Sequence, residues 1–272
     1  MTEPVLSVID VWKSYPKPLP FWKRVTSREP HPVFHAVAGV ELALAAHECL
    51  GVVGESGSGK TTLARMIAGL LEPSAGRMLL DGREAKAGSR AGVQMVFQDP
   101  TESLNPAFSA RQTIGEPLRL LRGERDPQAL RARVEALAEL VQLPAALLDR
   151  YPHQLSGGQR ARVGIARALA PAPRVLLLDE PTTALDVSVQ AKILLLLDDL
   201  KRKLDMSMLL VTHDLSVVRL LCDRVVVMKE GRIVESGSVQ HVMSAPEHAY
   251  TRSLIAALPR MRRPSRVTAL AQ

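Results

Sequence analysis

The sequence predicts an α/β fold in which a mainly parallel sheet forms the core, with an antiparallel β subdomain before it and a helical subdomain inserted into it. From residue 170 onward, short apolar runs alternate with segments of helical spacing, a pattern typical of parallel sheets covered by helices. Residues 6–12 and 37–44 instead alternate apolar and polar side chains, as half-buried strands do. Between residues 99 and 169, helical spacing without strand-like runs interrupts the pattern.

The β subdomain and the first core unit come first along the chain. Residues 6–12 and 37–44 are expected to form a small antiparallel sheet, with the Pro-rich and basic segment 16–32 as an exposed loop between them. Residues 49–53 form an uninterrupted apolar run, which is typical of a buried strand, and residues 62–67 have the character of a helix. A glycine-rich turn joins this strand to this helix.

Helical spacing dominates the inserted subdomain. Turn residues follow Gln98 as far as Pro106, and helical segments continue from there to a helix predicted over residues 160–169. Four apolar residues recur at helical intervals and are expected on one face: Leu130, Val134, Leu137 and Val141.

β/α alternation resumes after this subdomain. The sequence predicts strands at 175–178 and 208–211, helices at 187–204 and 215–221, and a terminal hairpin over 224–236 that turns at Glu230-Gly231. No internal repeat is evident, so a single domain is expected. Its predicted parts are the core with its β subdomain at 1–98 and 170–240, the helical subdomain at 99–169 and a C-terminal tail at 241–272.

The composition argues against several classes of protein. No apolar run approaches the roughly 20 residues that a membrane-spanning helix requires, and the N-terminus lacks the pattern of a signal peptide, so a cytosolic location is expected. The only cysteines are Cys49 and Cys222, too few for a disulfide framework or a cysteine-rich metal site. The net charge of +7 suits a protein that works beside an anionic membrane leaflet, while 3% aromatic residues argue against a nucleic-acid platform.

The turn between the first core strand and its helix reads GESGSGKT and fits the pattern G-x-x-x-x-G-K-[ST]. In that pattern the backbone N–H groups surround phosphate oxygens, the lysine reaches the β- and γ-phosphates, and the hydroxyl binds magnesium. An ordinary strand-to-helix turn is the alternative reading. The residues expected to contact ATP here are Gly54, Glu55, Ser56, Gly57, Ser58, Gly59, Lys60, Thr61 and Thr62.

Four further motifs follow in order: Gln98 after an apolar strand, LSGGQ at 155–159, VLLLDE at 175–180, and His213 after LLVT. This set resembles the motifs of ATP-binding-cassette (ABC) proteins, and the resemblance covers nearly the whole chain. At finer grain, several segments are similar to the dipeptide, oligopeptide and nickel importer ATPases. These are FQDP at 97–100, SLNP at 103–106, YPHQLSGGQRARV from Tyr151, EPTTALDVSVQ from Glu180, THDLSVV from Thr212 and HAYTRSLIAALPR from His248.

The resemblance implies ATP hydrolysis with bound Mg²⁺. Thr61 would bind the metal directly, Asp179 would hold it through water, and Lys60 would counter phosphate charge. Gln98 would complete the metal or water geometry. Glu180 would act as the general base, with a second metal-site charge as the alternative role.

His213 resembles the histidine that contacts the γ-phosphate and links it to Glu180. The signature residues Ser156, Gly157, Gly158 and Gln159 would close over ATP held by a second subunit, and Asp186 would lie at that interface. Tyr15 lies where this family places an aromatic ring that stacks on adenine, although a tyrosine packed on the sheet is the alternative.

The sequence thus favours the ATP-hydrolysing subunit of a peptide importer, peripheral to the cytoplasmic face of the inner membrane. The expected partners are a second ABC ATPase, identical or, as we favour, a paralogue, two transmembrane permease chains, and an external solute-binding protein reached through the permease. A nickel or other small-solute importer is the alternative. Two remoter ones are a soluble cassette acting on nucleic acid or ribosomes and a nonhydrolysing regulatory subunit, which the intact Glu180 argues against.

Overall fold

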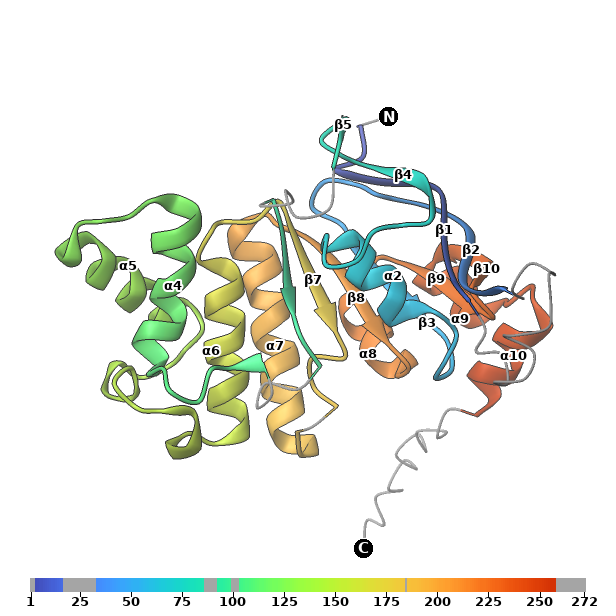
Figure 1. Ribbon diagram of the computed structural model, residues 1–272. Helices are drawn as coiled ribbons and strands as arrows, with labels where there is room; N and C mark the ends of the chain where they lie inside the picture. Colours follow the sequence, from blue (N-terminus) through green and yellow to red (C-terminus); the bar gives the residue numbers. More distant parts are fainter. Residues whose placement is uncertain (1–2, 17–32, 86–91, 99–102, 184, 258–272) are drawn as a thin grey trace, which may run out of the picture.

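A computed structural model describes residues 3–16, 33–85, 92–98, 103–183 and 185–257. This part of the chain contains two sheets: the larger one lies between helices, and the smaller one lies beside it at the edge of the molecule (Figure 1). The expected loop over residues 17–32 and the basic stretch 260–266 lie outside the described residues, as do residues 99–102.

The smaller sheet is antiparallel and has four strands in the order β2-β1-β4-β5. Its strands are β1 Leu6–Pro16, β2 Val33–Leu44, β4 Ala75–Leu80 and β5 Arg83–Glu84. The predicted pairing of β1 with β2 is confirmed, and it extends beyond the predicted bounds as far as Pro16 and Val33, including the pair Tyr15 and Phe34. Both of these side chains are about half exposed, at 40% and 51%, so the apolar alternation that defines the inner part of the strands ends before the backbone pairing does.

The larger sheet has six strands in the order β10-β9-β3-β8-β7-β6 and is parallel except for β10. Its strands are β3 Cys49–Val53, β6 Val93–Val96, β7 Val175–Asp179, β8 Ser207–Thr212, β9 Arg224–Lys229 and β10 Arg232–Ser238. The β9–β10 hairpin turns at Glu230 and Gly231, as predicted, and both have positive φ angles of 48° and 79°. Because parallel strands share one direction, Val53, Asp179 and Thr212 end along the same edge of the sheet.

The helices cover both faces of this sheet. They are α2 Lys60–Ile67, α4 Ala110–Arg122, α5 Pro127–Leu140, α6 Gly157–Leu169, α7 Val187–Leu204, α8 Leu215–Leu221, α9 Val239–Ser244 and α10 Ala249–Ala256, with short 3₁₀ turns at Ala145–Leu147 and Pro152–Gln154. The predicted bounds of β3, α7 and α8 agree with the structure. The predicted tail carries two helices, α10 and most of α9.

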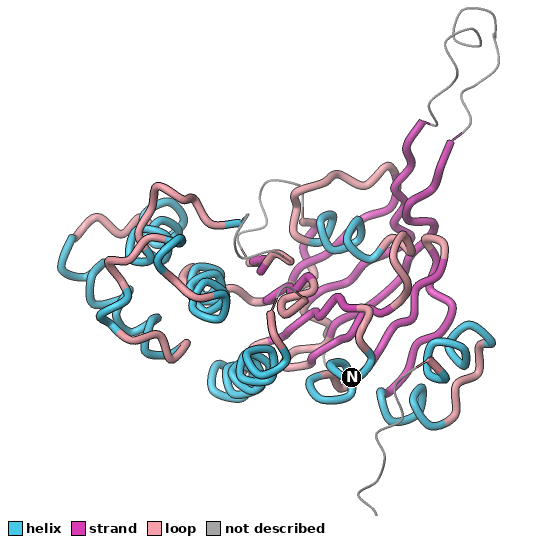
Figure 2. The backbone as a smooth tube through the Cα atoms, turned by 90° about the horizontal axis from the view of Figure 1, so that it is seen from below, coloured by secondary structure: helices cyan, strands magenta, loops and turns pink. Residues whose placement is uncertain are grey.

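Strand β7 shows how the core is divided between the two faces. Leu176 and Leu178 join a cluster with α4, α5, α6 and α7, whereas Val175 and Leu177 join a cluster with α2 and the antiparallel sheet. The strand is therefore buried on both faces, which explains its continuous apolar sequence. The β subdomain and the helical group consequently lie on opposite sides of the sheet (Figures 1 and 2).

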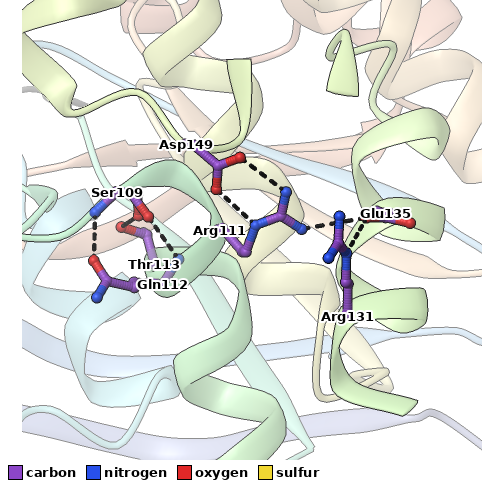
Figure 3. Close-up of polar contacts among 7 residues, drawn as sticks. All are labelled: Ser109, Arg111, Gln112, Thr113, Arg131, Glu135 and Asp149. Atoms are coloured by element: carbon purple, nitrogen blue, oxygen red, sulfur yellow. Dashed lines mark hydrogen bonds and ion pairs between the residues drawn. The ribbon is translucent and has the colours of Figure 1, made fainter. Parts of the chain in front are cut away.

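In the helical group, the predicted apolar face of α5 is confirmed: Leu130, Val134 and Val141 are buried, and Leu137 packs against the same cluster. Ser109 starts α4 with a capping box to Gln112. From the same first turn, Arg111 donates two hydrogen bonds to Asp149, of 2.8 and 3.2 Å, and a third to Glu135 on α5 (Figure 3). These contacts tie α4 and α5 to the segment that leads into α6.

Candidate active site

The glycine-rich turn predicted from GESGSGKT lies between β3 and α2, against the β9–β10 hairpin and β2. A Cβ atom at Gly54 would lie 2.2 Å from the carbonyl oxygen of Met228, and one at Gly59 would lie 2.3 Å from that of Ala36. Both backbone conformations have positive φ angles, 157° and 101°. Neither position accepts a side chain, so the turn keeps a backbone-lined surface.

Helix α2 begins directly after this turn with no side chain capping its first N–H groups. No acidic side chain lies in its first turn either. Unpaired N–H groups at a helix N-terminus bind anions well, and phosphate is the usual example. The start of α2 and the turn before it therefore form a suitable phosphate site.

Lys60 is folded back onto this turn. Its ammonium donates to the carbonyl oxygens of Gly54 and Glu55, both at 2.8 Å, and to the hydroxyl of Ser58 at 3.3 Å. Burial lowers the pKa of this amine, while the charges of Glu180, Asp179 and Glu55 act in the opposite direction. A phosphate oxygen carries charge and is a stronger acceptor than these neutral groups, so the lysine is poised to exchange one of them for phosphate.

Asp179 and Thr61 fit a magnesium ion. The hydroxyl of Thr61 lies 3.5 Å from a carboxylate oxygen of Asp179, and only 3% of Asp179 is exposed. Burial, together with the neighbouring charge of Glu180, raises the pKa of Asp179 to about 6. A divalent cation would stabilise the ionised carboxylate, and Mg²⁺ prefers oxygen ligands of these two kinds.

The substitution Asp179→Asn is expected to leave the protein without nucleotide and metal at least as stable as wild type. Because the folded-state pKa of this carboxyl lies above its ordinary value of 3.8, its ionisation opposes folding at pH 7, by roughly 1–3 kcal/mol. That cost starts to fall as the pH drops below about 6 and is gone below the ordinary pKa of 3.8, so wild type should gain stability relative to the variant across this range. Thermal melts of both proteins in the presence of a chelator, at several pH values from about 4 to about 7, would measure this difference in stability. A variant much less stable than wild type at pH 7 would contradict the expectation.

Glu180 is contacted by three other side chains at the end of β7. One carboxylate oxygen lies 3.0 Å from Nδ1 of His213, and the other accepts from the amide of Gln98 at 3.3 Å and from the hydroxyl of Thr183 at 3.0 Å. We call Glu180, His213, Gln98 and Thr183 the Glu180 cluster. The structure thus brings together three residues that the sequence singled out separately.

The backbone of Glu180 explains how two consecutive carboxylates serve different contacts. Its φ angle is +46°, while its N–H still donates to the carbonyl of Val211 at 2.8 Å. This left-handed conformation is unfavourable for a residue with a side chain and persists only where the surrounding structure requires it. It directs Glu180 towards Gln98 and His213, while Asp179 contacts Thr61.

Thr183 is a member of this cluster that sequence reasoning missed. Its backbone N–H also donates to the carbonyl of Glu180, at 3.3 Å, so it closes a turn over the carboxylate. A threonine three residues after a strand-end glutamate is the local signal that could have indicated this contact.

We expect Thr183→Val to lower kcat about 3- to 10-fold, because it removes one hydrogen bond that orients the Glu180 carboxylate. Thr183→Ser keeps the hydroxyl and is the matched control, with near wild-type kcat. Steady-state ATP hydrolysis compares the two. Equal rates in the valine and serine variants would show that the hydroxyl has no part in turnover.

The signature residues lie at the start of α6. Ser156 accepts from the N–H of Gln159 at 3.3 Å, and the Gln159 side chain accepts from the N–H of Ser156 at 2.8 Å, a capping box. A Cβ at Gly158 would lie 2.6 Å from Val189 of α7, and Asp186 caps that helix by accepting from the N–H of Val189 at 3.0 Å. The signature and the Asp186 turn therefore pack side by side within one chain.

Two further side chains, one of them predicted from the sequence, lie outside the phosphate-binding turn and the Glu180 cluster. Tyr15 is 40% exposed on β1, with the Lys13 ammonium 5.5 Å from its ring centroid, and its role towards adenine stays a prediction. Arg167 of α6 donates to the carbonyl of Ser103 at 2.6 Å and lies 6.0 Å from the ring centroid of Phe97. It thereby links Ser103 and Phe97 to the signature helix.

A family model described as ABC transporter matches residues 37–183 of the chain. The chain belongs to the ABC transporter family. Its sequence is 43% identical over 264 residues to the probable D,D-dipeptide transport ATP-binding protein DdpF of Escherichia coli (strain K12), covering 97% of this chain and 82% of that protein. It is 44% identical to the oligopeptide transport ATP-binding protein OppF of the same organism, covering 85% of this chain and 71% of OppF. The resemblance drawn from the motifs is thereby confirmed.

Solved ABC structures share the fold. The dimeric ATP-binding cassette MJ0796, in a post-hydrolysis state with ADP and phosphate, is 29% identical with a TM-score of 0.73, and covers 86% of this chain and 98% of that chain. The chain is accordingly an ATP-binding cassette of the ABC ATPase class. Among its described residues, no helix is both long enough and apolar enough to cross a membrane.

Proposed function

We propose that this ABC ATPase hydrolyses ATP at the Glu180 cluster to energise the import of peptides. The observation that carries the hydrolytic role is the convergence of His213, Gln98 and Thr183 on the carboxylate of Glu180. A carboxylate held by three partners at the same sheet edge as the phosphate-binding turn is placed to accept a proton from an attacking water. The relatives DdpF and OppF are named as dipeptide and oligopeptide transport proteins, which supports peptides as the transported class.

The roles of the remaining residues follow from their contacts. Gly54–Thr61 and Thr62 would surround the phosphates of ATP, with the Lys60 ammonium on the β- and γ-phosphates. Thr61, Asp179 and Gln98 would hold Mg²⁺, which supplies charge neutralisation on the phosphates. His213, 56% exposed on its side chain, would contact the γ-phosphate while it holds Glu180.

The signature residues 156–159 and Asp186 would complete the site of a second cassette. In this chain, Ser156 is exposed at the start of α6, so it is accessible to a partner's nucleotide. The dimeric cassette structure supports this arrangement. Two ATP molecules between the subunits would stabilise the dimer, and hydrolysis would release it.

The proposal also includes the other subunits of the importer and its cargo. A second ABC ATPase, two permease chains and an external solute-binding protein would complete an importer on the cytoplasmic face of the inner membrane. A nickel or other small solute is the alternative cargo, because the proposed site would contact nucleotide and not the transported solute. An action on nucleic acid or ribosomes has less support, because the closely similar relatives named above are transport proteins.

The decisive experiment is capture of the tagged chain from detergent-solubilised membranes of its native cell, followed by reconstitution of the captured complex in vesicles. Its ATP hydrolysis is then measured with the solute-binding protein loaded with a peptide mixture or with nickel. Two permease chains and stimulation by peptide would support the proposal. Stimulation by nickel alone would favour the alternative cargo, and recovery of ribosomes without any membrane subunit would overturn the importer role.

A further inference from the structure

Residues 248–251, HAYT, belong to a segment that is similar to importer ATPases, yet none of the roles above uses them. They begin helix α10, which packs on the core beside the phosphate-binding turn. We propose that Tyr250 is a positioning residue of that turn, whose hydroxyl holds the backbone of Glu55 in the conformation that receives the phosphates of ATP. This inference rests on the proposed role of Gly54–Thr61.

The contact joins residues that lie far apart in the sequence. The backbone N–H of Glu55 donates to the hydroxyl of Tyr250 at 2.9 Å. The carbonyl of the same residue accepts from the ammonium of Lys60 at 2.8 Å. Both polar groups of the Glu55 backbone are therefore held, one by the C-terminal helix and the other by the lysine expected to bind phosphate.

The ring of Tyr250 is fixed by its burial. The residue is only 8% exposed and packs in a cluster with Val53, the last residue of β3, and with Val227 of β9. The ammonium of Lys229 lies 5.2 Å from the ring centroid. Because this packing restricts the side chain, the position of the hydroxyl is determined by the core and not by the exposed turn.

Helix α10 is itself attached to the sheet. The carboxylate of Glu235 on β10 accepts from the N–H groups of Glu247 and His248, at 2.8 and 3.0 Å. His248 then caps the helix by accepting from the N–H of Tyr250 at 3.1 Å. A continuous set of hydrogen bonds thus runs from β10 through the start of α10 to Glu55 and Lys60.

The expected effect is on ATP binding and not on the chemical step. Without the hydroxyl, the N–H of Glu55 loses its partner, and the turn samples conformations that do not match the phosphates. Glu180 is contacted by Gln98, Thr183 and His213 and not by Tyr250, so its proton-accepting role is unaffected. We expect Tyr250→Phe to raise the KM for ATP and the Kd for Mg²⁺-ADP about 3- to 10-fold. The kcat value should stay within about twofold of wild type.

The test uses the full chain and three variants. Tyr250→Phe keeps the buried ring and removes only the hydroxyl. Ser253→Ala is the matched control, because it removes another hydroxyl of α10, one that donates to the Tyr250 carbonyl at 2.7 Å within the helix. Lys60→Ala reports on the phosphate site itself. Binding of Mg²⁺-ADP by calorimetry, the melting temperature, and amide hydrogen exchange of the peptide that contains Glu55 are measured for each.

Weaker Mg²⁺-ADP binding and faster exchange at Glu55 in Tyr250→Phe, with a melting temperature near wild type and with Ser253→Ala unchanged, would support the inference. Wild-type affinity and exchange in Tyr250→Phe would overturn it, as would the same loss in Ser253→Ala. A loss of affinity accompanied by a large fall in melting temperature would also overturn it, because the hydroxyl would then serve only folding. Normal Mg²⁺-ADP binding in Lys60→Ala would show that the assignment of the phosphate site is wrong as well. This variant therefore distinguishes a failure of the Tyr250 inference from a failure of the proposed function.

Discussion

Glu180→Gln is expected to bind ATP with near wild-type affinity and to hydrolyse it at least about 100-fold more slowly. The substitution keeps the size of the side chain, and its remaining carbonyl oxygen can still accept from Gln98 and Thr183. What it removes is the basic carboxylate that would take a proton from water. Because we propose that hydrolysis releases the closed dimer, we also expect the variant to accumulate as an ATP-bound dimer.

Steady-state phosphate release and size-exclusion chromatography with ATP measure both effects. Glu230→Gln is a suitable control, since Glu230 lies in the β9–β10 turn and the same chemical change there should leave turnover unaltered. Hydrolysis at the wild-type rate in Glu180→Gln would show that another group accepts the proton. Within the Glu180 cluster, His213 is the group to test next, because its Nδ1 lies 3.0 Å from the carboxylate.

Much of the fold could be predicted because its core strands are continuous apolar runs with clear ends. Strand β3 lies between a glutamate and a glycine-rich turn, and the predicted bounds agree with the structure. Helix α7 likewise begins after an aspartate cap and ends at Asp205, whose φ of 50° closes the helix. In such segments hydrophobic pattern and turn chemistry indicate the same bounds.

Other features could not be predicted from local pattern. The outer parts of β1 and β2 pair through exposed residues such as Tyr15 and Phe34, so no apolar alternation marks them. Helix α10 was expected only as part of a tail, although Tyr250 and Leu254 lie at helical spacing and contact the core. The contact between Tyr250 and Glu55 depends on tertiary structure alone, and no sequence motif encodes it.

The candidate site likewise combines residues that sequence motifs predict with features that depend on tertiary structure. Motif spacing identified Glu180, His213 and Gln98, and the structure brings His213 and Gln98 within hydrogen-bond distance of Glu180. The positive φ of Glu180 and the hydroxyl of Thr183 were not predicted, because both depend on the turn that follows β7. The pairing of signature and phosphate turn between two chains lies beyond a single chain and stays a proposal.

A charge placed at the signature tests that pairing directly. Ser156→Asp is expected to abolish most ATP turnover, by about 100-fold or more, while the chain's own ATP affinity is retained. Aspartate is as good a helix cap as serine, so it can still accept from the N–H of Gln159 and preserve the start of α6. Its negative charge would face the phosphates of the nucleotide held by the partner.

Ser156→Asn is the matched control, because asparagine has nearly the same shape and the same capping ability without the charge. Turnover should fall far less in this variant, and the two melting temperatures should agree.

Mixing Ser156→Asp with Lys60→Ala then separates the two sites. If identical subunits share the sites, mixed dimers form in which one site combines the intact phosphate turn of Ser156→Asp with the intact signature of Lys60→Ala. Activity then returns in part. If the partner is a paralogue, each variant recovers only with that second ATPase. Equal turnover in the aspartate and asparagine variants would contradict a phosphate facing Ser156, because only charge distinguishes them.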